Sequence, residues 1–193
     1  MAHLSVSTRH AGKQSSDKVL VGTVQEAIDR GAKGVSVQVN MGSTTEADMI
    51  ERLGIISSDT NYLDVPLLGM IYPRGENLSI MDGDVTEGAA HAARLAFELG
   101  CQVVKTKWTG SIESFRKVTN SVPIPVLIAG GPAGSSTEDI LQIVYDSMQA
   151  GGGGVCMGRQ VFSHENPEAM VSALKMIVHN GSEVSEAMKK CGL

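Results

Sequence analysis

Short apolar runs alternate with longer amphipathic segments along most of the chain. The runs are rich in Val and Ile, and they predict strands at 4–7, 34–39, 66–72, 102–106, 126–129 and 154–157. Between them, apolar residues recur at helical spacing and predict helices over 24–30, 45–62, 86–99, 112–120, 137–150 and 167–179, with a short last helix over 183–190. This alternation indicates successive βαβ units, and therefore an α/β fold built on a parallel sheet.

Residues at the ends of the predicted helices support this assignment. Thr44 or Thr45 is expected to cap the helix over 45–62, and Ser136 the helix over 137–150. Acidic residues follow both caps, where the helix dipole favours negative charge. Three glycines lie between a predicted helix and the next strand, where a left-handed residue commonly ends a helix: Gly31, Gly100 and Gly151.

Right-handed βαβ crossovers build either an open doubly wound sheet or a closed barrel. An open dinucleotide-binding sheet would carry Gly-x-Gly-x-x-Gly after its first strand, and this sequence has no such motif there. No linker or low-complexity stretch divides the chain. We therefore expect one domain over residues 1–193.

Composition excludes several classes of protein. Of the 193 residues, 42% are apolar and only 4% aromatic, so the core is expected to be aliphatic. The net charge of −5 and the lack of a basic cluster exclude a nucleic-acid-binding surface of the usual kind. No apolar run is long enough for a membrane helix, and the first residues do not resemble a signal peptide. Three widely separated cysteines indicate a reducing, cytoplasmic setting and argue against a zinc site.

Lys105 stands at the end of a predicted apolar strand and has two interpretations. Its side chain either reaches solvent from the strand terminus or serves as an amine that attacks a carbonyl carbon. Lys107 lies two residues further and therefore faces the same way on a strand. A like charge at that distance favours the neutral amine that such chemistry needs.

Glycine-containing turns follow the next two predicted strands. Gly130 and Gly131 follow the first, and Gly158 with Arg159 follows the second. Backbone N–H groups at two adjacent strand ends, joined by an arginine, can bind a phosphate group. The alternative is that these are ordinary turn glycines. Tyr72 also ends a predicted strand, where it either donates protons in a site or belongs to the core.

The motifs VVKTKWTGSIESF, PVLIAGGP and GVCMGRQVF, together with GVSVQVNMGS and LLGMIYPRG, closely resemble the archaeal-type class I aldolase family. The resemblance covers nearly the whole chain, from His3 to about His179. Members include fructose-bisphosphate aldolases and 2-amino-3,7-dideoxy-D-threo-hept-6-ulosonate synthases. The resemblance implies a TIM (β/α)8 barrel in homo-oligomers. It also implies a Schiff-base role for Lys105, proton transfer by Tyr72, and phosphate binding by the loops at Gly130, Gly131, Gly158 and Arg159.

The sequence departs from the family at three places. Ala133 stands where members often have lysine, and Gln38 stands where the synthases often have histidine. Members also begin with two further βα units, the first of which carries an Asp-His-Gly motif with an acid–base aspartate. The resemblance therefore implies about six of eight βα units, strands three to eight, in a domain that is incomplete at its N-terminus.

The resemblance predicts a class I aldolase or transaldolase that acts on a phosphorylated keto-sugar. The motifs are most similar to the heptulosonate synthases of aromatic amino acid biosynthesis, with a fructose-bisphosphate aldolase as the alternative. A second alternative is a non-catalytic remnant that binds a sugar phosphate without turning it over. No metal or organic cofactor is expected, because the lysine supplies the electrophilic catalysis. Homo-oligomers are expected, and neither nucleic acid nor membrane is an expected partner.

Overall fold

The computed structural model describes residues 1–78, 85–130 and 134–193. Within these residues one parallel sheet has six strands, in the order β1-β4-β5-β6-β7-β8. These strands are β1 (Ala2–His3), β4 (Val35–Met41), β5 (Leu67–Pro73), β6 (Val103–Thr106), β7 (Val126–Ala129) and β8 (Gly154–Cys156). A small antiparallel sheet pairs β2 (Ser5–Val6) with β3 (Val19–Leu20).

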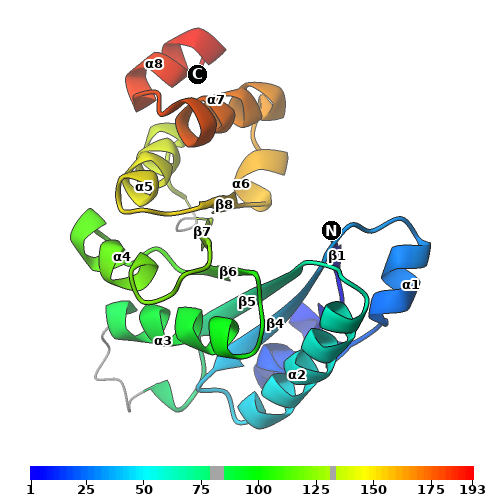
Figure 1. The fold of residues 1–193 in the computed structure, drawn as a ribbon. Coiled ribbons are helices and arrows are strands. Elements are labelled where there is room, and N and C mark those ends of the chain that lie inside the picture. The colour runs from blue at the N-terminus through cyan, green and yellow to red at the C-terminus, as the bar shows by residue number, and fades with distance from the viewer. Residues whose placement is uncertain (79–84, 131–133) are drawn as a thin grey trace.

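Helices cover the outer side of the parallel sheet. The helices of the described residues are α1 (Val24–Asp29), α2 (Glu46–Tyr62), α3 (Val85–Glu98), α4 (Ile112–Thr119), α5 (Thr137–Gln149), α6 (Arg159–Phe162), α7 (Pro167–Asn180) and α8 (Val184–Cys191), with a 3-10 segment, η1, over Arg9–Ser16. Of these, α6 lies at the carboxyl end of β8, and α8 packs on α5 and α7. Figure 1 shows α2, α3, α4 and α5 following one another around the outside of a curved sheet. The arrangement is a partial barrel, so the α/β expectation of about six βα units is confirmed.

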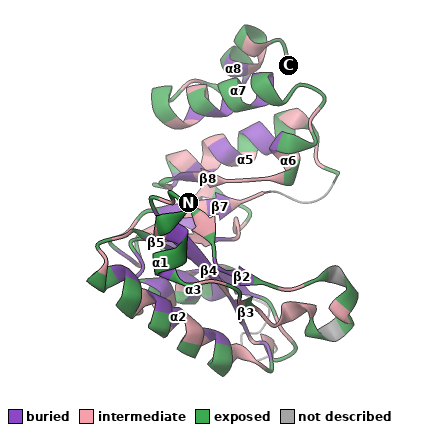
Figure 2. Cartoon of the chain, turned by 90° about the vertical axis from the view of Figure 1, so that its right-hand side faces the viewer, coloured by how far each residue is buried: buried purple, intermediate pink, exposed green. Residues whose placement is uncertain are grey.

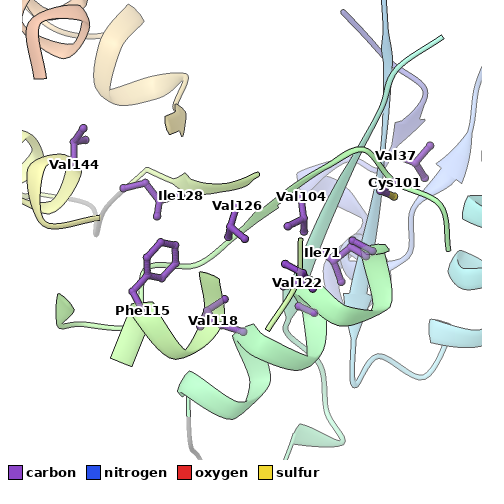
Figure 3. Packing of buried hydrophobic residues seen from close by; sticks show 14 of the residues in the cluster. Val37, Ile71, Cys101, Val104, Phe115, Val118, Val122, Val126, Ile128 and Val144 are labelled. Carbon is purple, nitrogen blue, oxygen red and sulfur yellow. The ribbon is translucent and has the colours of Figure 1, made fainter. Parts of the chain in front are cut away.

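The hydrophobic core lies between the outer face of the sheet and these helices. Side chains of a strand alternate between its two faces, and Val35, Val37 and Val39 of β4 are at most 1% exposed beneath the helices. On the helices, the buried residues form the inward-facing sides (Figure 2). In Figure 3 the Phe115 ring extends from α4 toward Val126 and Ile128 of β7. As composition predicted, aliphatic side chains make up most of this core.

The inner, concave face of the sheet is more polar. Gln38, Met70, Lys105 and Leu127 form one continuous register row across β4, β5, β6 and β7. Because these residues occupy alternate positions to the buried valines and isoleucines, their side chains face the barrel interior. Lys105 therefore lies near the middle of the interior face, with three strands of the described sheet on one side of β6 and two on the other.

The sequence predictions for the five later strands are confirmed to within a residue or two, but the first is wrong. A barrel strand was expected at 4–7, whereas the strand that pairs with β4 is Ala2–His3. The chain leaves the parallel ladder after Leu4, whose N–H still donates to Ser36 at 2.9 Å. The next donor along β4, the Gln38 N–H, is bound instead by the Ser5 side-chain oxygen at 2.9 Å. Because the chain has left the parallel sheet at this point, β2 pairs with β3 instead.

The predicted N-terminal capping side chain is confirmed at Ser136 but not at Thr45. Ser136 and Asp139 form a reciprocal capping box at the start of α5. Thr45 occupies the N-cap position of α2, yet its side chain caps nothing. There the Glu46 carboxylate reaches back instead and accepts from the Gly42 N–H at 3.0 Å. The three expected left-handed glycines, Gly31, Gly100 and Gly151, have φ of 89°, 80° and 87°.

Three short elements, η1, β3 and α6, were not predicted, because their sequences lack the apolar spacing that marks a helix or a strand. None of the helices within the described ranges has the length and apolar character that crossing a membrane requires.

Position 75, in the loop after β5, is expected to need glycine for the protein to keep its stability. A Cβ atom at this position would overlap the backbone of Gly42 and Ser43 in the loop after β4. Gly75→Ala should therefore lower the free energy of unfolding by about 1–3 kcal/mol, because backbone cannot move aside as a side chain can. Urea denaturation measures the change.

Gly54→Ala is the matched control, since Gly54 lies inside α2 with nothing within 4 Å of the added atom. It should stabilise the protein by about 0.5–1 kcal/mol through helix propensity. Equal unfolding midpoints for the two variants would contradict the proposed packing of the strand-end loops.

Candidate active site

A cavity of about 820 Å³ opens at the carboxyl ends of the parallel strands. Its lining comes from β4, β5, β6, β7 and β8 and from the loops that follow the last four of these. Parallel strands bring all their carboxyl ends to one edge of the sheet, and in barrels this is the edge that carries the chemistry. Of the residues predicted from sequence, the cavity brings together Tyr72, Lys105, Gly130, Gly158 and Arg159.

Lys105 reaches the cavity from β6. Its neighbours along the strand, Val104 and Thr106, are fully buried against the helices, so the alternation of the strand directs Lys105 inward. The lysine is half-buried rather than solvated at a strand terminus. The arrangement gives a primary amine at the centre of an interior face, which is the position that attack on a bound carbonyl carbon requires.

Tyr72 lies beside Lys105, at the next inward position on β5. Tyr72 is 8% exposed, and it lies close enough to Lys105 for the charge of that amine to act on the phenol. Burial raises the pKa of the Tyr72 phenol, and the charges of Lys105 and Arg74 oppose that shift only in part. The phenol therefore stays protonated at neutral pH and has a proton to give. The interpretation of Tyr72 as a site residue rather than a distant core residue fits this geometry.

The two glycine-containing turns lie on the other side of Lys105. Gly130 directly follows β7, and Gly158 precedes Arg159 at the start of α6. A Cβ on Gly130 would overlap the side-chain amide of Gln160, so the turns after β7 and β8 are in close contact. The Arg159 side chain is exposed at the cavity wall. Gly131 and Ala133, also singled out in the sequence, lie outside the described residues.

Lys107 lines the same cavity as Lys105, as their spacing predicted. Its amine donates a hydrogen bond of 3.2 Å to the carbonyl oxygen of Pro73, at the end of β5. Burial, with a smaller contribution from the nearby Arg74 charge, lowers the pKa of the Lys107 amine. Lys107 therefore belongs to the rim between the ends of β5 and β6.

Sequence reasoning did not assign roles to several lining residues. Gln38 lines the cavity from β4, and its side-chain amide donates to the Asn40 side chain at 2.9 Å. Cys156 of β8 and Trp108 after β6 line it too, and the Trp108 ring packs on Phe115 at 5.1 Å between centroids. The alternation of side chains along the strands could have identified Gln38 and Cys156 as lining residues, because both lie on the inward face with Lys105.

Comparison with known proteins supports an aldolase relationship. A family model described as DeoC/LacD family aldolase matches residues 1–164. A 2-amino-3,7-dideoxy-D-threo-hept-6-ulosonate synthase from Halobacterium salinarum is 41% identical over 100% of this chain and 71% of its own length. A 2-amino-4,5-dihydroxy-6-oxo-7-(phosphonooxy)heptanoate synthase from Streptomyces griseus is 38% identical over 100% of this chain and 69% of its own length. The chain thus spans about 70% of these relatives.

Solved structures agree with these relatives. An archaeal fructose 1,6-bisphosphate aldolase superposes with a TM-score of 0.85 and 32% identity, over 93% of this chain and 70% of that one. Another structure of an archaeal fructose-1,6-bisphosphate aldolase holds its catalytic lysine covalently bound to the carbinolamine intermediate of the substrate. It superposes with a TM-score of 0.84 and 32% identity, over 91% of this chain and 69% of that one. With its interior lysine and tyrosine, its matched family model and these relatives, the chain belongs to the DeoC/LacD aldolase family.

Proposed function

We propose that this chain performs class I aldolase or transaldolase chemistry on a phosphorylated keto-sugar, with Lys105 as the covalent residue. The observation that carries the proposal is the pair formed by the Lys105 amine and the buried Tyr72 phenol inside one cavity. That pair supplies both a nucleophile for a carbonyl carbon and a proton donor next to it.

The proposed reaction uses ordinary amine chemistry. The neutral Lys105 amine adds to the ketone carbon, and loss of one water molecule leaves an iminium ion. The bond between the α carbon and the β carbon of the former ketone then breaks, and its electron pair forms the carbon–carbon double bond of an enamine while the iminium nitrogen becomes neutral. Tyr72 gives its proton to the departing water, and the resulting phenolate takes the proton of the β-hydroxyl as that fragment becomes an aldehyde. The phenol then protonates the enamine carbon, and water hydrolyses the iminium to release the ketone and the free Lys105 amine.

The substrate assignment favours the heptulosonate synthases. The relative at 41% identity carries that name, and the relative at 38% is named as the synthase of a phosphonooxy-heptanoate, which is also a seven-carbon amino acid. A fructose-bisphosphate aldolase is the second candidate, favoured by the superposed structures. The third, a sugar-phosphate-binding chain without turnover, is kept because the chain spans about 70% of the relatives. Turnover and ligand titration, measured side by side on one sample, separate the third candidate from the first two.

The setting proposed for this activity is a reducing, cytoplasmic one, where the three cysteines stay free. The phosphate of the keto-sugar is assigned to the turns after β7 and β8, through Gly130, Gly131, Gly158 and Arg159. No metal is assigned a role, because the iminium ion itself withdraws electrons from the breaking bond.

Lys105 is expected to be trapped by reduction. Incubation with dihydroxyacetone phosphate followed by borohydride should attach the reduced sugar to this lysine, because the iminium is the species that borohydride reduces. Peptide mass spectrometry locates the adduct. An adduct confined to Lys107, or no adduct in a folded sample, would show that the covalent residue is misassigned.

Tyr72→Phe is expected to slow turnover by about 10²–10⁴-fold, the usual contribution of acid–base assistance, while borohydride trapping on Lys105 persists. The substitution removes only the hydroxyl and keeps the ring that packs in the site. Steady-state rates and trapping yields are compared with the parent. If the variant loses its fold or its trapping, the hydroxyl has a structural rather than a proton-transfer role.

Arg159→Ala is expected to weaken binding of a phosphorylated ketose by about 10- to 100-fold, since a charge-assisted hydrogen bond is worth roughly 1.5–3 kcal/mol. Binding of the dephosphorylated sugar should scarcely change. Arg30→Ala, an exposed arginine at the end of α1, is the control. Equal losses for both sugars would argue that Arg159 supports the structure of the loop.

Self-association is expected for the chain in solution. The outer edges of β1 and β8 have no partner strand in the described part of the sheet, and open edges favour pairing between chains. Light scattering should report a mass above that of one chain of 20.3 kDa. A stable monomer at micromolar concentration would contradict the homo-oligomer proposal.

A further inference from the structure

Strand β4 presents polar side chains to the interior of the barrel. Ser36, Gln38 and Asn40 alternate with the buried valines of this strand, so all three side chains face inward. Ser36 and Asn40 are buried, at 2% and 0% exposure, whereas Gln38 is half-buried and lines the cavity. Gln38 is thus a residue through which β4 can contact a ligand, and the proposed chemistry assigns it no role.

Hydrogen bonds fix the direction in which the Gln38 side-chain amide points. The Asn40 Nδ2 donates to the carbonyl oxygen of Ser16, at the end of η1, and a carbonyl oxygen can only accept. The Asn40 Oδ1 is therefore the atom turned toward Gln38, and it accepts from the Gln38 Nε2 at 2.9 Å. The backbone of the glutamine is held as well, because the Gln38 N–H donates to the Ser5 hydroxyl oxygen at 2.9 Å.

The oxygen of this amide, Gln38 Oε1, is left for a ligand. It accepts no hydrogen bond within the part of the chain that the structure describes, and it is not enclosed there. A fixed acceptor needs a donor, which in a ligand is a hydroxyl or an ammonium group. The charged side chains among the described lining residues are all cationic, and they repel an ammonium group. Position 38 therefore favours a neutral hydroxyl.

The order of the strands brings one particular hydroxyl toward Gln38. Under the proposed function the ketone lies at Lys105 on β6, and the phosphate lies toward β7 and β8. The α carbon on the other side of the ketone then points toward β5 and β4. Gln38 belongs to the register row of Lys105, two strands away, which is roughly 10 Å along the sheet. Because the sheet is concave, inward-pointing side chains of β4 and β6 converge, and one small ligand can touch both (Figure 1).

We infer that Gln38 Oε1 accepts a hydrogen bond from the α-hydroxyl of the bound ketone and so determines which ketones the site prefers. Tyr72, on the strand between Gln38 and Lys105, takes the proton of the β-hydroxyl, so the α-hydroxyl needs a different acceptor. Asn40 is the positioning residue that holds the amide. The inference rests on the proposed function, which places the ketone and the phosphate. The ligand class is thus narrowed to phosphorylated ketones with a hydroxyl on the α carbon opposite the phosphate.

Two phosphorylated ketones test this contact, because dihydroxyacetone phosphate and hydroxyacetone phosphate differ only in the α-hydroxyl. Their dissociation constants, measured by calorimetric titration of the whole chain, give a ratio that expresses the preference for the hydroxyl. Gln38→Met replaces the amide by an apolar side chain of similar length. It should shift the ratio by about 2- to 10-fold against dihydroxyacetone phosphate, the usual range for one neutral hydrogen bond. A general loss of packing would weaken both ligands alike and leave the ratio unchanged.

Two further variants complete the test. Gln38→Ala removes the amide without filling its space, and it should shift the ratio in the same direction. Gln142→Met makes the same chemical change as Gln38→Met on an exposed side of α5, where the Gln142 amide donates to Asp146. This control should keep the ratio of the parent.

The contact is refuted if the parent binds neither ketone, if the Gln38 variants keep the parent ratio or lose both ketones alike, or if Gln142→Met shifts the ratio as well. Borohydride trapping with the same two ketones separates this result from the proposed function. Adducts on Lys105 together with an unchanged ratio overturn the assignment of Gln38 alone. A shifted ratio without any adduct overturns the Schiff-base role of Lys105 and supports the hydroxyl contact.

Discussion

The structure depends on the parallel register that places Lys105 opposite Met70 on one side and Leu127 on the other. The register is maintained by the outer face of the sheet, where valines and isoleucines pack beneath the helices. A slip of one residue would turn those side chains into the cavity and Lys105 into the core. Burying an ionisable amine among apolar side chains costs more free energy than a shifted register could recover. The packing of the core therefore keeps Lys105 on the cavity side of the sheet.

Close backbone contacts join the loops at the carboxyl ends of the strands. Gly75 leaves no room for a side chain against the backbone of Gly42, and a Cβ on Gly130 would meet the side-chain amide of Gln160. The Lys107 amine is bound to the carbonyl of Pro73 across two strands. Each contact connects the loops of two neighbouring strands. The loops that form the cavity wall therefore contact one another at the strand ends and are not independent.

The cavity has a charge opposite to that of the chain. The protein has a net charge of −5, whereas the charged side chains that line the cavity among the described residues are Arg74, Lys105, Lys107 and Arg159. A cleft lined by one sign of charge concentrates ligands of the other sign. The charges of the lining therefore suit an anionic ligand.

The sequence by itself determined the βα order, five of the six barrel strands, the capping box at Ser136 and the left-handed glycines, because each depends on residues close together in the chain. It also indicated Lys105, Tyr72 and the glycine turns, since these end apolar strands. The tertiary structure alone decided that the sheet begins at Ala2–His3, that Thr45 caps nothing, and that Gln38, Arg74 and Cys156 share a cavity with Lys105. Those facts depend on which strands become neighbours, and neighbours in a curled sheet are set by packing between segments distant in sequence.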